Sequence, residues 1–435
     1  MKVPRLLTIQ QLRLRENQLF LAVTIVVGVL CGLSAVLFTL AIERVTHLFF
    51  GVSPSDPRSF FVPVGVSLLT CLLLARYFSD VRGSGVPQTK AAFHLHGGII
   101  PWRVPIGKFL TAVLCIGSGH SIGREGPSVQ IGAGIASGIG QYLRLSPART
   151  KELVPVGAAA ALSAAFNTPV AAVIFALEEI IGDMNAALLG STVVASVSAV
   201  IVERAILGNE PLFRVPAFQL VHSAELIAYA FLGIAGGLLS VVFARGLLGL
   251  RAFFRQLPER TRPLQPAMGG VLIGLFLIFV PEVRGVGYEY VDQALNGGMI
   301  LKTLLLLTVF KMLATTISYA SGNAGGIFAP SLFIGAMAEG AVGMAAHRIA
   351  PLTTGDPAAY ALVGMGTLFA GIIRAPMTSV FMIFELTQDY QIIVPLMVAN
   401  TLSFVISRRY QPTPIYHSLL QQDQINLPST ARRIE

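Results

Sequence analysis

Residues 108–133 read KFLTAVLCIGSGHSIGREGPSVQIGA, and residues 311–336 read KMLATTISYASGNAGGIFAPSLFIGA. The two stretches align without a gap and share lysine, SG, PS and IGA at the same places. Upstream, VRGSG at Val81 matches VRGVG at Val283, and downstream VGAAAALSAAFNTP matches VGMGTLFAGIIRAP. Three blocks in the same order, at a nearly constant offset of about 200 residues, indicate one long internal repeat rather than chance similarity.

The composition places this repeat in a membrane. Hydrophobic residues make up 54% of the chain, charged residues 12%, and the mean hydropathy is +0.71, whereas soluble proteins carry about 25% charged residues. These values predict an all-α polytopic membrane protein and exclude a soluble α/β enzyme. The net charge of +9 comes from cations at the termini and in loops, where they anchor to lipid headgroups. We therefore expect membrane lipid as a partner and no nucleic acid.

The apolar segments divide into two groups. We expect a first membrane repeat at 18–206, a second at 222–407, and cytoplasmic segments at 1–17 and 408–435. Several segments are too short to span about 30 Å of hydrocarbon, or are broken by Gly and Pro. Helices interrupted in this way are typical of transporters that bind substrate at the membrane midplane.

Loop charge predicts how the two halves are oriented. The loop at 45–59 carries one Arg and one Asp, whereas the corresponding loop at 249–264 carries four arginines. By the positive-inside rule the second loop is cytoplasmic and the first is not. Equivalent loops on opposite sides mean an inverted repeat, whose broken segments meet at mid-membrane. Both termini are then cytoplasmic, in keeping with their basic residues: Lys2, Arg5, Arg13, Arg15, Arg408 and Arg409.

Three helix starts supply the chemistry expected at that meeting point. GREGPSVQIG and GGIFAPSLFIG each place glycines before a proline suited to a first helical turn, and GSGVPQ puts Ser84 before another such start. Free N–H groups at a helix N-terminus carry about half a positive charge. The pattern predicts an anion site that favours rapid passage over tight binding.

Glu125 is the unusual residue at these helix starts, and its repeat counterpart is Phe328. An ionised carboxylate can occupy the anion position, whereas a protonated one loses its attraction and can swing away. The alternative is that Glu125 only pairs with Arg124. Because an acid inside a membrane is functional by default, we favour the switch.

Together, GSGVP, GREGP, GGIFAP and the late tyrosine of TPIYHSLL resemble the four anion-site motifs of the CLC chloride channels and chloride/proton antiporters. The resemblance extends from the first apolar run to Tyr416. It implies a homodimer with one pore per subunit, Ser84 and Tyr416 as hydroxyl ligands of the anion, and the N–H groups of Ile327 and Phe328 as further donors. Glu125 becomes the external gating glutamate.

A second acid bears on whether the protein is a channel or an antiporter. Glu178 aligns with Glu385 across the repeat and is expected to be structural in both halves, whereas Glu179 aligns with Leu386. In the transporters that this chain resembles, a glutamate at this place passes protons from the cytoplasm. We therefore predict chloride/proton exchange with Glu179 as the internal proton acceptor. The alternatives are a passive voltage- or pH-gated chloride channel, and for Glu179 a surface acid at a helix end.

Other expectations are narrower. Serine at position 84 resembles chloride-selective members, whereas nitrate-preferring relatives have proline there, so we expect chloride as the main anion. Gln88 stands where many members have an acid, which leaves the local pairing open. Lys108 and Lys311 match across the repeat, and either a structural or an anion-steering role is open. The resemblance also implies no cystathionine-synthase-type domains, because few residues follow Tyr416.

The remaining candidate groups favour no enzyme and no cofactor. The cysteines lack metal-ligand spacing and are expected to be buried. A membrane enzyme using Ser118, Ser121 or His120 lacks an orienting acid. We expect no metal at His94, His96 or His120. The predicted location is the cell membrane, in particular a bacterial inner membrane.

Overall fold

The computed structural model describes residues 4–51, 57–183, 186–209, 211–213, 215, 222, 224–351 and 353–428. Side chains are described from Gln18 onward, apart from residues 186 and 187. Lys2 and residues 429–435 of the two expected cytoplasmic segments lie outside the described residues, as does Asp56 of the first loop.

The described chain is helical, with two isolated β-bridges and no longer strand in these residues. The first half contains α1 (Pro4–Phe50), α2 (Arg58–Arg76), η1 (Ser79–Val81), α3 (Val86–Leu95), α4 (Arg103–Gly117), α5 (Glu125–Tyr142), α6 (Pro147–Phe166), α7 (Pro169–Phe175), η2 (Ala176–Ile181) and α8 (Ala186–Leu207). The second half contains α9 (Glu225–Gln256), η3 (Glu259–Leu264), α10 (Gln265–Phe279), η4 (Pro281–Val283), α11 (Tyr288–Leu295), α12 (Leu301–Ala320), α13 (Phe328–Ile349), α14 (Pro357–Ile373), α15 (Pro376–Thr387) and α16 (Ile393–Tyr410). A last helix, α17 (Ile415–Gln422), follows both halves.

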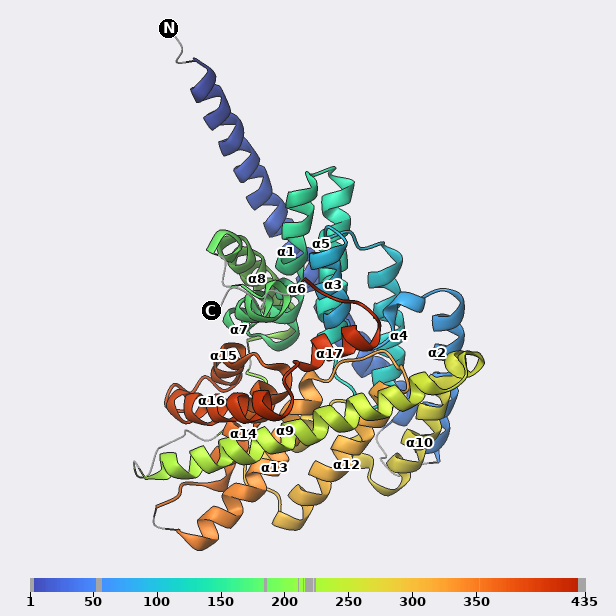
Figure 1. Cartoon of the computed structure of the whole chain (residues 1–435), viewed down its shortest axis with the longest axis vertical. Helices are drawn as coiled ribbons and strands as arrows, with labels where there is room; N and C mark the ends of the chain where they lie inside the picture. Colours follow the sequence, from blue (N-terminus) through green and yellow to red (C-terminus); the bar gives the residue numbers. More distant parts are fainter. Residues whose placement is uncertain are drawn as a thin grey trace.

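The helices α1–α8 recur in order as α9–α16. Figure 1 shows the blue-to-green first half beside the yellow-to-red second half, with α17 near the middle of the view. α17 contacts α3 of the first half and both α9 and α14 of the second. Seven of the described helices are long and apolar enough to cross a membrane. The predicted all-α membrane fold is confirmed.

Two helix breaks occur at matched places and have the same cause. Asn167 (φ 58°) and Arg374 (φ 69°) adopt the left-handed conformation that ends α6 and α14. Two residues later Pro169 and Pro376 begin α7 and α15, where a missing N–H is tolerated. At each of these two places one helix therefore ends and a second begins, instead of a single continuous span.

A local two-fold axis relates the halves. Gly123 and Gly326 are repeat counterparts, and each donates its N–H to the carbonyl of the other at 2.7 Å. This mutual exchange is the pattern of an antiparallel pair, which has a local two-fold axis between its two residues. Because these residues are repeat counterparts, that axis is the one that relates the halves. α5 and α13 begin two residues after these glycines, so their N-termini start from the same place in the centre of the molecule.

Candidate anion pathway

Glu125 lies buried at the start of α5, with its carboxylate directed at the start of α13. Its Oε1 accepts a hydrogen bond from the Tyr288 hydroxyl at 2.7 Å, and its Oε2 accepts from the Ala329 N–H at 3.3 Å. A carboxylate therefore occupies a position at the N-terminus of α13, where free N–H groups and the helix dipole favour negative charge. A transported anion would compete for the same donors.

Arg124 does not neutralise this acid by a direct ion pair. Its guanidinium donates to Thr39 Oγ1 at 3.0 Å and to the Ala165 carbonyl at 2.9 Å, and lies 5.7 Å from the centre of the Tyr288 ring. Within the described residues no Arg124–Glu125 contact reaches ion-pair distance. Neighbours in sequence point apart here, so the alternative interpretation of Glu125 as the partner of Arg124 has no geometric support.

Ser84 and Tyr416 bring two hydroxyls to the centre from α3 and α17. Both residues are fully buried, and neither hydroxyl has a hydrogen-bond partner among the described residues. Ser84 Oγ lies against the first turn of α5, since a Cβ added to Gly126 would be 2.4 Å from it. Two buried donors without partners are suited to an anion.

Ile327 and Phe328 provide two N–H groups at the start of α13. Neither group donates a hydrogen bond within the described residues, as expected at a helix N-terminus. The Phe328 ring packs on Phe369, with centroids 4.4 Å apart, and also on Phe166 and Phe175. This apolar cluster holds the start of α13 in place where the other half carries the acid.

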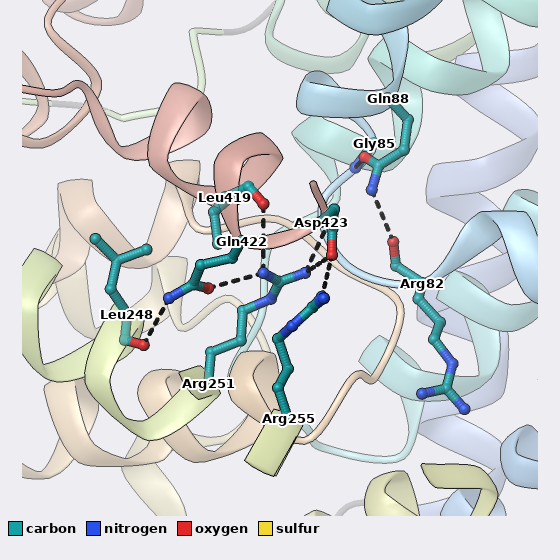
Figure 2. A network of polar contacts seen from close by, with 9 residues as sticks. All are labelled: Arg82, Gly85, Gln88, Leu248, Arg251, Arg255, Leu419, Gln422 and Asp423. Carbon is teal, nitrogen blue, oxygen red and sulfur yellow. Dashed lines mark hydrogen bonds and ion pairs between the residues drawn. The ribbon is translucent and has the colours of Figure 1, made fainter. Parts of the chain in front are cut away.

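Gln88, which stands where many family members have an acid, forms hydrogen bonds with the backbone that precedes α3. Its Oε1 accepts from the Gly85 N–H at 3.0 Å, and its Nε2 donates to the Arg82 carbonyl at 3.2 Å (Figure 2). The neutral amide thus caps α3 and ties it to the preceding turn. Gly85 has φ +107°, a conformation that disfavours any side chain, and a Cβ there would lie 2.6 Å from the Gly126 carbonyl.

Glu179 is buried in η2, with 4% of its surface exposed, so it is not a surface acid. Its Oε1 accepts from Lys90 Nζ at 2.8 Å, and 15% of the Lys90 side chain is exposed. Lys90 was missed by the sequence analysis. It follows Ser84 on α3, and the available signal was a cation placed one turn into a helix that begins at the anion site.

Glu178 and Glu385 have the structural role expected of them. Glu385 accepts from the N–H groups of Val170 and Ala171 at 3.0 and 2.7 Å, at the start of α7. Glu178 accepts from the N–H groups at the matched positions of α15, at 3.4 and 2.9 Å. Each acid therefore caps the broken helix of the opposite half, and Glu179 has no such duty.

Lys108 and Lys311 make equivalent contacts in the two halves. Lys108 Nζ donates to the carbonyls of Val81 and Gly83, both at 2.7 Å. Lys311 Nζ donates to the matched carbonyls of Val283 and Gly285, at 3.1 and 2.8 Å. Both amines are fully buried, and each fixes the turn that precedes a helix start. This geometry supports the structural role rather than anion steering.

Tyr288 was the second residue that the sequence analysis missed. It begins α11 at the repeat counterpart of Val86, directly after VRGVG. A hydroxyl at one of two matched helix starts was the available signal, but the match alone does not show that the side chain reaches Glu125.

His120 and the three cysteines are buried, whereas His94 is partly buried and His96 is exposed. His120 lies within hydrogen-bond distance of Ser67 Oγ at 2.9 Å and Ser118 Oγ at 3.0 Å, and His94 contacts the Ile180 carbonyl at 3.0 Å. Ser121 is bonded to Thr315. All three cysteines are buried and unpaired with one another. Among the described residues no group of His, Cys, Asp or Glu could hold a metal ion.

Comparison with known proteins identifies the family. A family described as "Voltage gated chloride channel" matches residues 66–408, most of the chain. The chain belongs to this CLC family. It is a family of transporters and channels rather than of enzymes.

Two relatives and two solved structures illustrate the CLC likeness. The chain is 30% identical to the H(+)/Cl(-) exchange transporter ClcA of Vibrio campbellii, over 91% of this chain and 88% of that protein. It is 34% identical to the putative chloride channel protein ClcB-like of Ralstonia nicotianae, over 84% and 87%. A slow cyanobacterial Cl−/H+ antiporter superimposes with TM-score 0.85 at 29% identity, covering 96% of this chain and 99% of that one. A CLC-type fluoride/proton antiporter, at 22% identity and TM-score 0.78 over 93% and 98%, shares the fold.

Proposed function

We propose that this protein exchanges chloride for protons across the membrane. The observation that carries the proposal is the placement of two buried acids, Glu125 at the N-terminus of α13 and Glu179 in η2 beside Lys90. The relatives named as exchange transporters and the cyanobacterial antiporter support it. No cofactor is required, because the transported ions are the only reactants.

Chloride binds between the two halves in this mechanism. The hydroxyls of Ser84 and Tyr416 donate from one side, and the N–H groups of Ile327 and Phe328 donate from the start of α13. These donors are neutral apart from the helix dipole, so the anion is held without a full opposing charge and can leave quickly.

Glu125 is the gate and external proton acceptor in this mechanism. When ionised it occupies the donors of Tyr288 and Ala329. Protonation removes its attraction to the α13 N-terminus, so chloride can replace it. Protonation of Glu125 and entry of chloride into the site that Glu125 leaves are thereby coupled.

Glu179 is the internal proton acceptor in this mechanism, and Lys90 forms an ion pair with it on the side from which protons enter. Lys90 Nζ lies 2.8 Å from the buried Glu179 carboxylate, and the partial exposure of Lys90 connects the pair with solvent on that side. A proton that arrives at Glu179 breaks the pair and leaves the acid neutral for onward transfer.

The test is simultaneous measurement of chloride and proton flux in liposomes. Wild type is expected to move protons uphill when driven by a chloride gradient. Glu179→Gln should lower proton flux by roughly a hundredfold while chloride still passes, because the internal acceptor is lost. Glu125→Gln should pass chloride without coupling to pH, since it mimics the protonated gate. Glu259→Gln, an exposed acid on η3, is the matched control and should behave as wild type.

A passive channel is the second candidate, favoured by the ClcB-like relative named as a putative chloride channel. Under opposed chloride and proton gradients, a channel reverses at the chloride equilibrium potential, whereas an exchanger is displaced from it. If the wild-type protein carried chloride with no proton flux, a passive channel would be the correct function instead of exchange.

We further propose a homodimer in the cell membrane, in a bacterium the inner membrane, with one pore per subunit and both termini cytoplasmic. The resemblance to CLC proteins supports the dimer. Light scattering of the purified protein in detergent tests it, and a monomeric mass would exclude it.

A further inference from the structure

A cavity of about 450 Å³ lies outside the helix-start anion site, between α3, α9, η3 and the end of α17. Gly83, the neighbour of Ser84, forms part of its wall, so the cavity adjoins one entrance to the anion site. Four arginines and two aspartates line it: Arg82, Arg251, Arg255, Arg262, Asp80 and Asp423.

Two of the arginines share one aspartate in the wall, which offsets one of their two charges. Arg251 Nη2 donates to both carboxylate oxygens of Asp423, at 2.8 and 3.0 Å, and Arg251 Nη1 donates to Gln422 Oε1 at 2.8 Å, while Arg255 pairs with the same aspartate (Figure 2). Gln422 in turn donates to the Leu248 carbonyl at 2.9 Å. This network fixes the end of α17 on α9, and it uses up the charge of Asp423.

The other two arginines have no acid. Arg82 Nη2 donates to the backbone carbonyl of Arg262 at 3.0 Å, so the two arginines lie side by side in the cavity wall. Neither side chain reaches a carboxylate within ion-pair distance in the described part of the chain, and Asp80 is paired with Arg103 at 2.6 Å. Two repelling cations in one cavity are stabilised by an anion of more than one charge.

This cationic cavity is not a product of the repeat. The counterpart of Arg82 is Arg284, which lies 4.6 Å from the centre of the Phe50 ring in the other half. Arg262 belongs to the arginine-rich connection between α9 and α10, and the matched connection of the first half carries one arginine. If these arginines only attracted chloride to the pathway, matching arginines would be expected at both entrances. Their presence at one entrance only therefore favours another role.

We propose that this cavity binds a small phosphate-bearing ligand on the side that carries the arginine-rich loop, and that Arg82 and Arg262 are its principal ligands. Guanidinium forks match the paired oxygens of a phosphate, and 450 Å³ is far more space than one chloride needs but is suited to a phosphorylated small molecule. Because Gly83 is in the wall, the bound ligand narrows the path to Ser84 and slows anion transport. The inhibition rests on the proposed chloride transport, whereas binding of the ligand does not.

Isothermal titration calorimetry of the full chain in detergent tests binding, with inorganic pyrophosphate as the probe. We expect saturable binding, weakened roughly tenfold by Arg82→Gln and by Arg262→Gln, since each loses a charged hydrogen-bonded contact. Arg260→Gln is the matched control, because Arg260 is an exposed arginine of the same short helix that does not line the cavity. It should bind pyrophosphate as wild type does.

Two transport arms identify the source of the phosphate. Pyrophosphate added to the loop side of liposomes should slow chloride efflux in wild type and less in Arg262→Gln, which supports a soluble ligand. Slowing only in vesicles that contain phosphatidic acid, with the same Arg262 dependence, supports the site and assigns it to a lipid headgroup. No binding at millimolar pyrophosphate and no effect of phosphatidic acid, or equal weakening by Arg260→Gln, would overturn the proposal. Absent chloride flux with intact pyrophosphate binding would instead count against the proposed function alone.

Discussion

Single side chains divide into those that shape the pathway and those that give it chemistry. Lys108 and Lys311 are buried cations that bond backbone carbonyls in both halves, so they shape the turns. Ser84 and Glu125 differ between the halves, where their counterparts are Val286 and Phe328. The candidate functional side chains are thus the ones that break the two-fold match.

The Ser84 hydroxyl provides the first prediction at this scale. It is a buried donor without a partner among the described residues, and a localised chloride charge gains more from one hydroxyl than the spread charge of nitrate does. Ser84→Pro should therefore raise nitrate transport relative to chloride by roughly tenfold, about the value of one charged hydrogen bond. Anion-exchange rates in liposomes measure the ratio, and an unchanged ratio would show that Ser84 is not a ligand.

Helices with matched starts position the candidate anion site. α5 and α13 begin two residues after the mutually bonded Gly123 and Gly326, so their N-termini are fixed relative to each other by backbone alone. α7 and α15 are fixed in the same reciprocal way by Glu385 and Glu178. Interrupted helices are stable in a membrane only because groups such as these satisfy their free ends.

The two capping acids give a paired prediction. Glu178→Gln and Glu385→Gln each remove a charged acceptor from a helix N-terminus, which should cost about 1–2 kcal/mol of unfolding free energy in either half. Thermal unfolding in detergent should show similar losses for both variants. Proton coupling should persist in the protein that remains folded. Loss of coupling in Glu178→Gln with unchanged thermal stability would move that residue into the proton path beside Glu179.

At the scale of the whole molecule, the two-fold repeat and the loop charges together predict an orientation. By the positive-inside rule we expect the arginine-rich connection between α9 and α10 on the cytoplasmic side, and the connection between α13 and α14 on the opposite side. Exposed apolar side chains, such as Phe279 at 80% and Ile349 at 84%, are those of a surface in contact with lipid.

Orientation can be measured with introduced thiols. The three native cysteines are buried, so they should react little with a membrane-impermeant maleimide. Arg348→Cys, in an exposed position at the end of α13, should be labelled in intact cells. Arg260→Cys should be labelled only after the membrane is opened. The reverse pattern would invert the orientation and place the arginine-lined cavity outside.

The sequence by itself determined the membrane class, the repeat, the matched helix starts and the acids that have no counterpart, because hydropathy, glycine and proline positions and unmatched charges are all local properties. Tertiary structure decided which groups meet. Tyr288 reaches Glu125 from a helix about 160 residues away in the chain, and Lys90 reaches Glu179 across about 90 residues. The cavity combines arginines from a turn, a long helix and a loop. Such contacts depend on how the helices pack around the two-fold axis, and no single stretch of sequence shows which distant residues will lie close together.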